Sequence, residues 1–561
     1  MKGSAFSLLI CSTITLLFGC LWCQAAPAKN DAADPAAATP KRESPKSQLT
    51  PEQERGLRLL KSAEAEAASL EPDMRAFVLS RVANAYGRID QRKADKLALD
   101  AFTATQAIPE PAEGDYCAAV GSAGDIKSWI QQGVLYEMVH KDKADEVEPL
   151  LPQATAPVRD QITSELVRYY ESKKDLSRAE SLLSQLADSE RYPFGAAADL
   201  VTALGPEQSG ERMTVFNQAL NNYEQHAKQS SFGGDDIGTF IEGAWKDVPP
   251  ALALEAIGKV LEAAKDQQSD SRYSMTSAKG SVVLNSGYDL RLFQLLPILE
   301  ELDKAKAEAL LRERSEVAEQ LRTYPKGMQS LQGGSPSVSF GVTDGSHSLT
   351  GPAAQQQVEA QLQDRVQEIL KKTDTEPAGA LASALGLPVH GGFQGSPRAS
   401  ALLQIAEKTT KKKPSVSKSA LDEFSGFQEQ LTPKEIPDVA RLPELYLRLG
   451  DVEGAKKALK ILLSAAGKLY DLDLDQDDPN RSFKGAWPST DLWRKSVQQA
   501  AKISSSLPEE IISELQDPEI AAFEKVAYGS ALAGGSGVNV DAPILISECR
   551  KNGVASYRVS F

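Results

Sequence analysis

Three segments of this chain follow one pattern, and that pattern restricts the possible fold more than any other feature. The segments run from Val82 to Phe102, from Leu166 to Leu186, and from Leu442 to Leu463. Each contains a tyrosine near the end of an apolar-striped stretch, then an aspartate, then an alanine four residues later. Such an aspartate can cap the second helix of an antiparallel pair, and the small alanine lets that helix approach its partner closely. The pattern therefore predicts helix pairs.

The aspartate and alanine of the three units are Asp90 with Ala94, Asp175 with Ala179, and Asp451 with Ala455. The unit resembles the helix-turn-helix unit of tetratricopeptide-like repeats. The copies are irregularly spaced, however, and no steady period of about 34 residues runs through the chain. The resemblance implies an irregular solenoid of stacked helix pairs.

Capping signals mark the start of further helices. Thr50 is followed by a proline and, three residues after the cap, by Gln53, which is the pattern of a capping box. Asp517 before Pro518 is a second helix start. Regular β alternation is nearly absent. We therefore expect an all-α fold, with a Gly/Ser-rich loop insertion and a disordered N-terminal tether.

The chain beyond its first 48 residues is longer than a single compact core usually grows. We expect one helical repeat array over residues 49–325 and a second over 353–535, followed by a C-terminal extension over 536–561. Residues 326–352 form the Gly/Ser-rich loop. Val338, Phe340 and Val342 alternate with small residues there, before Asp344 and Gly345, so this loop is either a short hairpin or a mobile segment.

The N-terminus reads as a signal for export. Lys2 precedes an uncharged apolar run and a small residue at position 25, so we expect a signal peptide over residues 1–25. A competing interpretation is a lipobox that ends at Cys20, which would become lipidated. Residues 26–48 are rich in proline and alanine and should be a disordered linker. The protein is then periplasmic or secreted, or a lipoprotein anchored to the cell envelope.

Net charge and cysteine content indicate which classes of partner and which covalent cross-links to expect. The formal net charge is -15, which disfavours nucleic acid and anionic membranes as partners, except for a membrane anchor through Cys20. Only Cys117 and Cys549 of the five cysteines lie in the main body. An exported protein could join them, but sequence does not give the distance between their Cα atoms. Two free thiols are the favoured expectation.

Five aspartates gather between Asp471 and Asp478, where a calcium loop is one interpretation. Asp471, Asp473 and Asp475 occupy loop positions 1, 3 and 5, which supply oxygen ligands in calcium-binding helix-loop-helix sites. The second half of the pattern fails, because Gln476 replaces the glycine and Ser482 replaces the bidentate glutamate.

The favoured alternative for this segment is an acidic loop between two helices. In that case Ser489 or Thr490 caps the next helix, and Trp493 packs inward.

Other catalytic and metal-binding patterns are weak. The histidines are His140, His226, His347 and His390, and none pairs with another at the spacing of metal ligands on a helix. His140 with Asp142 and Asp145 comes nearest to a metal cluster, although a solvated histidine at a helix end is favoured. Neither a nucleophile elbow nor a phosphate-binding loop is present. We expect no catalytic residue and no cofactor.

The function expected from these features is that of an exported, non-catalytic α-solenoid scaffold for protein–protein interaction. Stacked helix pairs present long faces suited to an extended protein or peptide ligand. The alternative is a secreted polysaccharide hydrolase or lyase, in which helix pairs close into an α/α toroid. The low aromatic content, 6%, counts against the dense stacking surface of a sugar cleft.

Overall fold

The computed structural model describes residues 49–87, 89–109, 116–119, 126–226, 236–266, 271–277, 280–331, 339–344, 353–390, 395–433, 435–474, 483–534, 546–551 and 554–559. Residues from Thr50 onward form one compact unit. The predicted signal peptide, Cys20 and the 26–48 linker lie outside the described residues.

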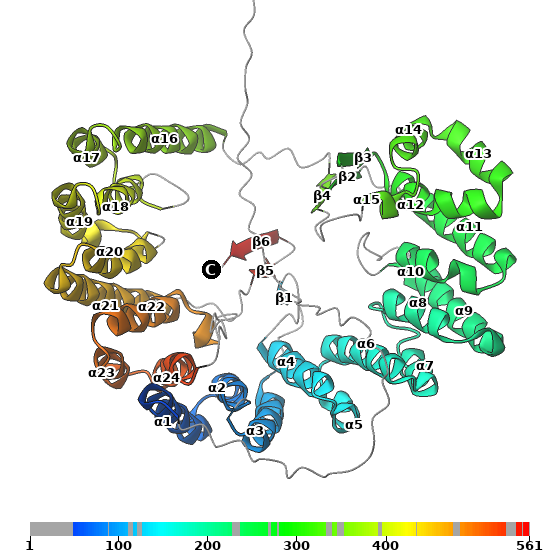
Figure 1. The fold of residues 1–561 in the computed structure, drawn as a ribbon, viewed down its shortest axis with the longest axis horizontal. Coiled ribbons are helices and arrows are strands. Elements are labelled where there is room, and N and C mark those ends of the chain that lie inside the picture. The colour runs from blue at the N-terminus through cyan, green and yellow to red at the C-terminus, as the bar shows by residue number, and fades with distance from the viewer. Residues whose placement is uncertain are drawn as a thin grey trace, which may run out of the picture. The chain divides into compact units, whose positions relative to one another are not determined.

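Helices account for most of the described chain (Figure 1). Those that precede the Gly/Ser-rich loop are α1 (Pro51–Glu66), α2 (Pro72–Tyr86), α3 (Gln91–Ala104), α4 (Ile126–His140), α5 (Ala144–Val147), α6 (Ala156–Lys173), α7 (Leu176–Ser184), α8 (Phe194–Ala203), α9 (Ser209–His226), α10 (Ile237–Ala244), α11 (Pro250–Asp266), α12 (Gly287–Leu302), α13 (Lys304–Glu313), α14 (Ser315–Thr323) and α15 (Met328–Leu331). Those that follow it are α16 (Ala353–Lys372), α17 (Pro377–Leu385), α18 (Pro397–Thr409), α19 (Pro414–Phe427), α20 (Leu442–Arg448), α21 (Val452–Leu474), α22 (Pro488–Ile503), α23 (Leu507–Glu514) and α24 (Pro518–Leu532).

The predicted all-α fold of stacked helix pairs is confirmed. Each of the three units found in the sequence is a pair of packed neighbours: α2 with α3, α6 with α7, and α20 with α21. None of the described helices is both long enough and apolar enough to cross a membrane.

The capping contacts of the three units explain where their second helices begin. Asp90 and Asp175 each accept a hydrogen bond from the backbone N–H three residues on, at 3.1 and 3.3 Å. Asp451 accepts the equivalent bond from Gly454 at 2.8 Å. The alanine four residues after each aspartate is buried, and the two helices of each pair are packed together. The predicted roles of aspartate and alanine are therefore correct.

The tyrosines of two units join each pair to the preceding helices. The Tyr170 hydroxyl donates to Oε1 of Glu148 at 2.8 Å, and the Tyr446 hydroxyl donates to Oδ1 of Asp422 at 2.7 Å. Burial, and then the neighbouring carboxylate, raise the pKa of both tyrosines. Both hydroxyls therefore remain protonated donors between consecutive pairs.

Among the described residues, the last helix packs on the first. Helix α24 lies along α1 and also contacts α2, although it ends the region expected to be the C-terminal array (Figure 1). Its Phe523 and Val526 belong to the hydrophobic core built by the helices before residue 332. Helices α16 to α23 build a second core. We call the contact between α1 and α24 the joint.

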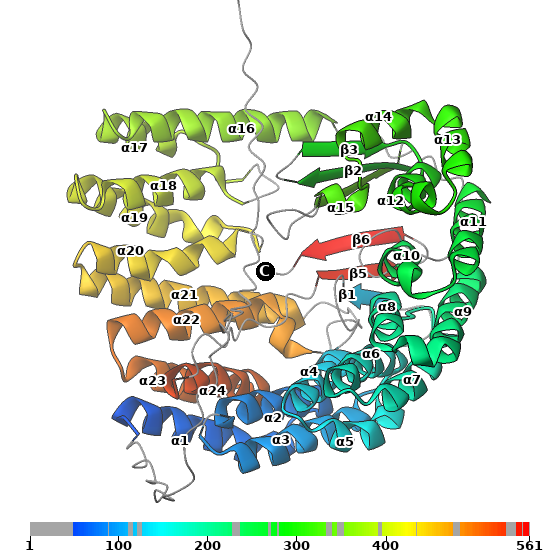
Figure 2. The same cartoon turned by 45° about the vertical axis from the view of Figure 1, so that its right-hand side comes forward.

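We expected β structure to be nearly absent, but the described residues include two small antiparallel sheets (Figure 2). One has the order β1–β5–β6, and the other has the order β3–β2–β4. Their bounds are β1 (Tyr116–Ala119), β2 (Ser271–Ser277), β3 (Gly280–Leu284), β4 (Ser339–Asp344), β5 (Ile546–Lys551) and β6 (Val554–Val559). Strands β5 and β6 fall in the segment expected to be a plain C-terminal extension.

The second sheet shows the alternation that sequence inspection overlooked. Tyr273 and Met275 on β2, and Val282 and Leu284 on β3, are buried, and the two strands contact α12. Strand β4 lies within the segment considered as a hairpin, and it pairs with β2. Residues 345–352, where a return strand would lie, are outside the described residues.

Candidate functional site

The acidic segment begins inside a helix rather than in a loop. Helix α21 continues to Leu474, so Asp471 and Asp473 lie in its last turn, while Asp475 is outside the described residues. The side chain of Asp473 is buried, and its Oδ2 accepts the backbone N–H of Ser489 at 3.0 Å. Asp473 therefore bonds one of the amides that the first turn of α22 leaves without a partner inside the helix.

The predicted cap of α22 by Ser489 or Thr490 is wrong. The residue before this helix is Trp487, whose side chain makes no capping bond. The bond comes instead from Asp473 on the preceding helix. Trp493 is partly buried against the second core, in agreement with its expected inward packing. The calcium-loop hypothesis includes Asp475 and stays a prediction.

Replacing Asp473 with alanine should lower the free energy of unfolding by about 1–3 kcal/mol, because the Ser489 amide is left buried without its acceptor. The matched control is Asp471→Ala on the same turn, whose exposed side chain predicts a change within about 0.5 kcal/mol. Thermal melts with calcium and with a chelator separate the two interpretations. A calcium-dependent rise in melting temperature that Asp473→Ala abolishes would favour the calcium loop over the capping role.

A cluster of ionic side chains surrounds the start of α24, and we call it the joint cluster. Nζ of Lys484 lies 2.8 Å from Oδ2 of Asp517 and 2.9 Å from Oε2 of Glu519. The Tyr470 hydroxyl donates to Asp517 at 2.7 Å. The ring of Trp487 covers the cluster, with its centroid 5.7 Å from Nζ of Lys484. Hydrogen bonds from Lys484 and Tyr470 outweigh burial and lower the pKa of Asp517.

The joint cluster also reaches α2. The backbone N–H of Glu71 donates to Oε1 of Glu519 at 3.1 Å. Burial, and the negative charge of Glu519, raise the pKa of Asp73 in the first turn of α2. Glu519 thus bonds the α21–α22 connection on one side and the start of α2 on the other.

Ionic contacts and close backbone packing complete the joint. Nζ of Lys525 lies 2.6 Å from Oε1 of Glu66, which is 459 positions away in the sequence. Arg55 pairs with Glu509. Gly56 and Gly529 face each other so closely that a Cβ on Gly56 would be 2.6 Å from the Gly529 carbonyl oxygen. Both glycines are needed because the two backbones touch.

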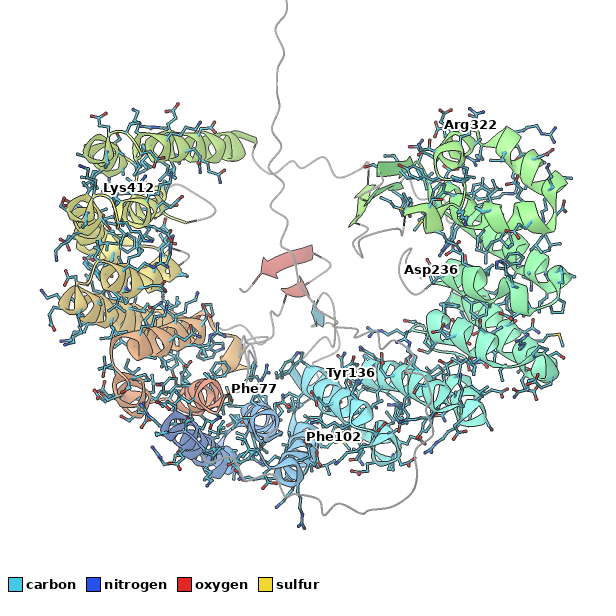
Figure 3. All side chains as sticks on the ribbon, viewed as in Figure 1. Phe77, Phe102, Tyr136, Asp236, Arg322 and Lys412 are labelled. Atoms are coloured by element: carbon cyan, nitrogen blue, oxygen red, sulfur yellow. The ribbon has the colours of Figure 1, made fainter. Side chains whose placement is uncertain are left out.

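An aromatic cluster fills the core beneath the joint. Phe77 on α2, labelled in Figure 3, stacks on Phe523 of α24 with ring centroids 5.3 Å apart. Its centroid lies 5.2 Å from that of Phe483. Trp129 of α4 lies on its other side, at 6.1 Å. This cluster joins residues from opposite ends of the chain. Sequence inspection found none of these partners, since single phenylalanines carry no pairing signal.

A carboxyl group is fully buried in α24. Glu524 is 0% exposed, and no donor among the described residues reaches either of its side-chain oxygens. Burial raises its pKa well above the usual range, against the opposing charge of Arg494. Glu524 is therefore neutral in the folded protein at pH values at which an exposed glutamate is already ionised.

Glu524→Met should stabilise the protein by about 1–3 kcal/mol at pH 8, because an apolar side chain of similar size removes a buried polar group without a partner. The folded state holds the Glu524 proton more tightly than the unfolded chain does. The contribution of Glu524 to stability consequently falls as the pH rises from about 4.5 toward its raised pKa. Denaturant titrations at pH 4 and pH 8 check the sign. The advantage of the variant should grow with pH, and an advantage that shrinks would contradict the buried neutral state.

A second buried polar cluster lies between α10 and α12. Nη1 of Arg291 lies 2.8 Å from Oδ2 of Asp236 and donates to Oε1 of Gln294 at 2.9 Å. The other oxygen of Asp236, a residue labelled in Figure 3, caps α10 by accepting the Thr239 N–H at 2.9 Å. Burial raises the pKa of the adjacent Glu242 to about 7. Arg291 fixes two helices relative to each other.

The histidine clusters considered in the sequence do not form metal sites in the described part of the chain. His140 Nδ1 lies 3.0 Å from the Tyr136 carbonyl oxygen. Asp142 pairs with Lys173 and Asp145 with Arg178, each at 2.7 Å, so both acids bind the neighbouring helices.

The remaining described histidines, His226 and His390, belong to no group of side chains that could hold a metal ion. His347 lies outside the described residues. His390 Nδ1 is 3.1 Å from Oε2 of the buried Glu435. His226 ends α9.

Two shallow hollows lie beside the capping aspartates of the units. One, of about 340 Å³, is lined by Glu64 of α1 and by Asp90, Lys93, Lys96 and Asp100 at and along α3. The other, of about 490 Å³, is lined by Ser415 and Lys418 of α19 and by Gly450 and Asp451 at the α20–α21 turn. Each hollow therefore lies between one helix pair and the helix before it, with charges of both signs.

Taken with the fold, this geometry defines the chain as an all-α protein of stacked helix pairs whose turns carry charged hollows. No protein-family model matches the sequence, and none of the curated proteins matches it.

Proposed function

We propose that the protein is an exported, non-catalytic scaffold that binds a protein or peptide through a tetratricopeptide-like array of helix pairs. The observation that supports it best is the recurrence of a charged hollow at the capping aspartate of two units, beside Asp90 and beside Asp451. Stacked repeats place equivalent turns along one direction, which suits an extended ligand. The step from fold to binding is an analogy between folds.

The buried polar groups support the same proposal. The ionic side chains of the joint cluster and of the Arg291 cluster bond one helix to another. They hold the array together, while Lys96 in the first hollow is exposed, and Lys418 in the second is exposed and pairs with Asp451. Charges of both signs there suit a polar, extended partner segment, whose binding should weaken as salt rises.

Site-specific photo-crosslinking in the producing cell tests the proposal. A photoreactive residue replaces Lys96 in the first hollow or Ser415 in the second, and Lys304 on α13 serves as the exposed control. We expect the two hollow positions to form an adduct with the same partner, and the control position to form none. Adducts of equal yield and identity at all three positions, or none at either hollow, would refute binding at the hollows.

Export through a signal peptide over residues 1–25 is part of the proposal, with lipidation at Cys20 as its alternative form. Cell fractionation and the mass of the mature N-terminus distinguish the two. Cleavage after residue 25 leaves an unmodified N-terminus, whereas the lipoprotein begins at a diacylated Cys20.

One observation favours the second candidate function, polysaccharide hydrolysis or cleavage. Burial, together with the charge of Asp199, raises the pKa of Glu171 to about 8. A protonated acid beside a carboxylate is the composition that glycosidases use. Release of reducing ends from a panel of polysaccharides, abolished in Glu171→Gln, would establish this function. Equal release by both proteins would reject it.

A further inference from the structure

Strands β1 and β5 bring the two cysteines of the main body to one register position. Antiparallel pairing sets Tyr116 opposite Arg550, Cys117 opposite Cys549, and Ala118 opposite Glu548. Figure 2 shows β1 alongside β5 and β6. The two cysteines are 432 positions apart in the sequence, so this register is a product of the tertiary fold.

We propose that Cys117 and Cys549 form a disulfide bond across this strand pair. Directly opposed residues of antiparallel strands have Cα atoms about 4.5–5.5 Å apart and belong to the same face of the sheet. Disulfides span Cα separations of about 4.4–6.8 Å. The strand register therefore places the two Cα atoms within the range that a disulfide spans, which the sequence alone could not show. We accordingly propose a disulfide in place of the two free thiols that we expected from the sequence.

The bond forms by thiol–disulfide exchange with a disulfide oxidant, either an oxidoreductase or oxidised glutathione. The thiolate of one cysteine attacks a sulfur of the oxidant and releases the other sulfur as a thiolate. The second cysteine, after losing its proton, attacks the resulting mixed disulfide and releases the remaining oxidant thiolate. The two cysteines together lose two protons and two electrons, and the oxidant is reduced to two thiols.

This bond would fasten the C-terminal strands to the N-terminal array. Strand β1 lies between α3 and α4, while β5 follows α24. Elements far apart in the sequence already meet at the joint, where α24 packs on α1 and α2. The disulfide is thus a second, covalent link between the N-terminal and C-terminal parts of the chain, in addition to the ion pair of Lys525 with Glu66.

Peptide mapping of the full chain tests the proposal. The protein is equilibrated in a buffer of oxidised and reduced glutathione, alkylated under denaturing conditions without reduction, and digested. We expect one linked peptide pair that contains Cys117 and Cys549, with both cysteines blocked from alkylation. Separate, fully alkylated or glutathionylated peptides would overturn the proposal, as would linkage found only between two chains on a non-reducing gel.

Two cysteine pairs placed on a background of Cys117→Ser and Cys549→Ser test the register itself. Ala119→Cys with Ser547→Cys restores a directly opposed pair on the same face and should form the bond. Ala118→Cys with Ser547→Cys is offset by one position, which places the cysteines on opposite faces, and should not. Equal linkage of both pairs would reject the register.

The proposed export determines only where the cell forms the bond. Because mapping is done in a defined buffer, failure of export and failure of the disulfide are distinguishable. An exported chain with free thiols, or a linked chain that stays inside the cell, would each reject one proposal and leave the other standing.

Discussion

Replacing Gly56 with valine should cost about 3–5 kcal/mol of folding free energy, one of the two largest effects expected for this protein. A Cβ at this position meets the Gly529 carbonyl oxygen at 2.6 Å and the Ala533 backbone nitrogen at 2.7 Å. Both are backbone atoms of the α24 segment, so no side-chain rotation relieves the clash. The joint must open, and the contacts of Lys525 with Glu66 are lost with it.

The matched control for this substitution is Gly467→Val in α21. Gly467 is also inside a helix, but nothing lies within 4 Å of a Cβ built there. We expect its denaturation midpoint to stay close to that of the parent protein. Limited proteolysis supplies a second measurement, since Gly56→Val should expose α24 to cleavage. Equal midpoints for the two variants would show that the joint does not contribute to stability.

Arg291→Met should lower the free energy of unfolding by about 3–5 kcal/mol, because it leaves the Asp236 carboxylate buried without its guanidinium partner. Arg291 is 1% exposed and Asp236 is 6% exposed, so water does not replace the lost partner. The measurement is a denaturant titration of the variant against the parent. Arg322→Met, at an exposed position labelled in Figure 3, is the control and should change stability by less than about 0.5 kcal/mol.

A double-mutant cycle assigns this loss to the ion pair. Asp236→Asn removes the charge but keeps an oxygen that can cap α10. Added to Arg291→Met, it should recover part of the lost stability, because no charge then remains buried without its partner. If the two losses add without recovery, the contribution of Arg291 is packing rather than charge.

Local features were predictable because they depend on neighbours in the sequence. The capping box at Thr50 is present, with its side chain accepting from the Gln53 N–H at 3.2 Å. Asp90, Asp175 and Asp451 cap helices as expected, since a cap needs only an acceptor within three residues of an amide. The helix pairs follow from the same short-range pattern.

The candidate site was only partly predictable. The sequence pattern indicated Asp473 as a metal ligand. In the structure, its carboxylate instead accepts a hydrogen bond from the backbone N–H of Ser489 in α22, which lies 16 residues later in the sequence. The hollows include two aspartates recognised as caps, Asp90 and Asp451. The residues that line them from the preceding helices, Glu64 and Ser415, were not predicted to lie beside these aspartates, because the approach of one helix pair to another is not encoded in a short stretch of sequence. The hollows therefore form only when helix pairs stack, and they could not be predicted from the sequence.

The sequence by itself determined the helix pairs, their caps and the buried alanines, because hydrophobic periodicity and capping act within a few residues. Only the tertiary structure decided that α24 packs on α1, that β1 pairs with β5, and that Glu524 is buried. These contacts join positions up to 459 residues apart. The sequence around a glycine, a cysteine or a glutamate does not reveal whether that residue contacts a distant part of the chain or water. Long-range packing alone therefore decides the roles of these residues.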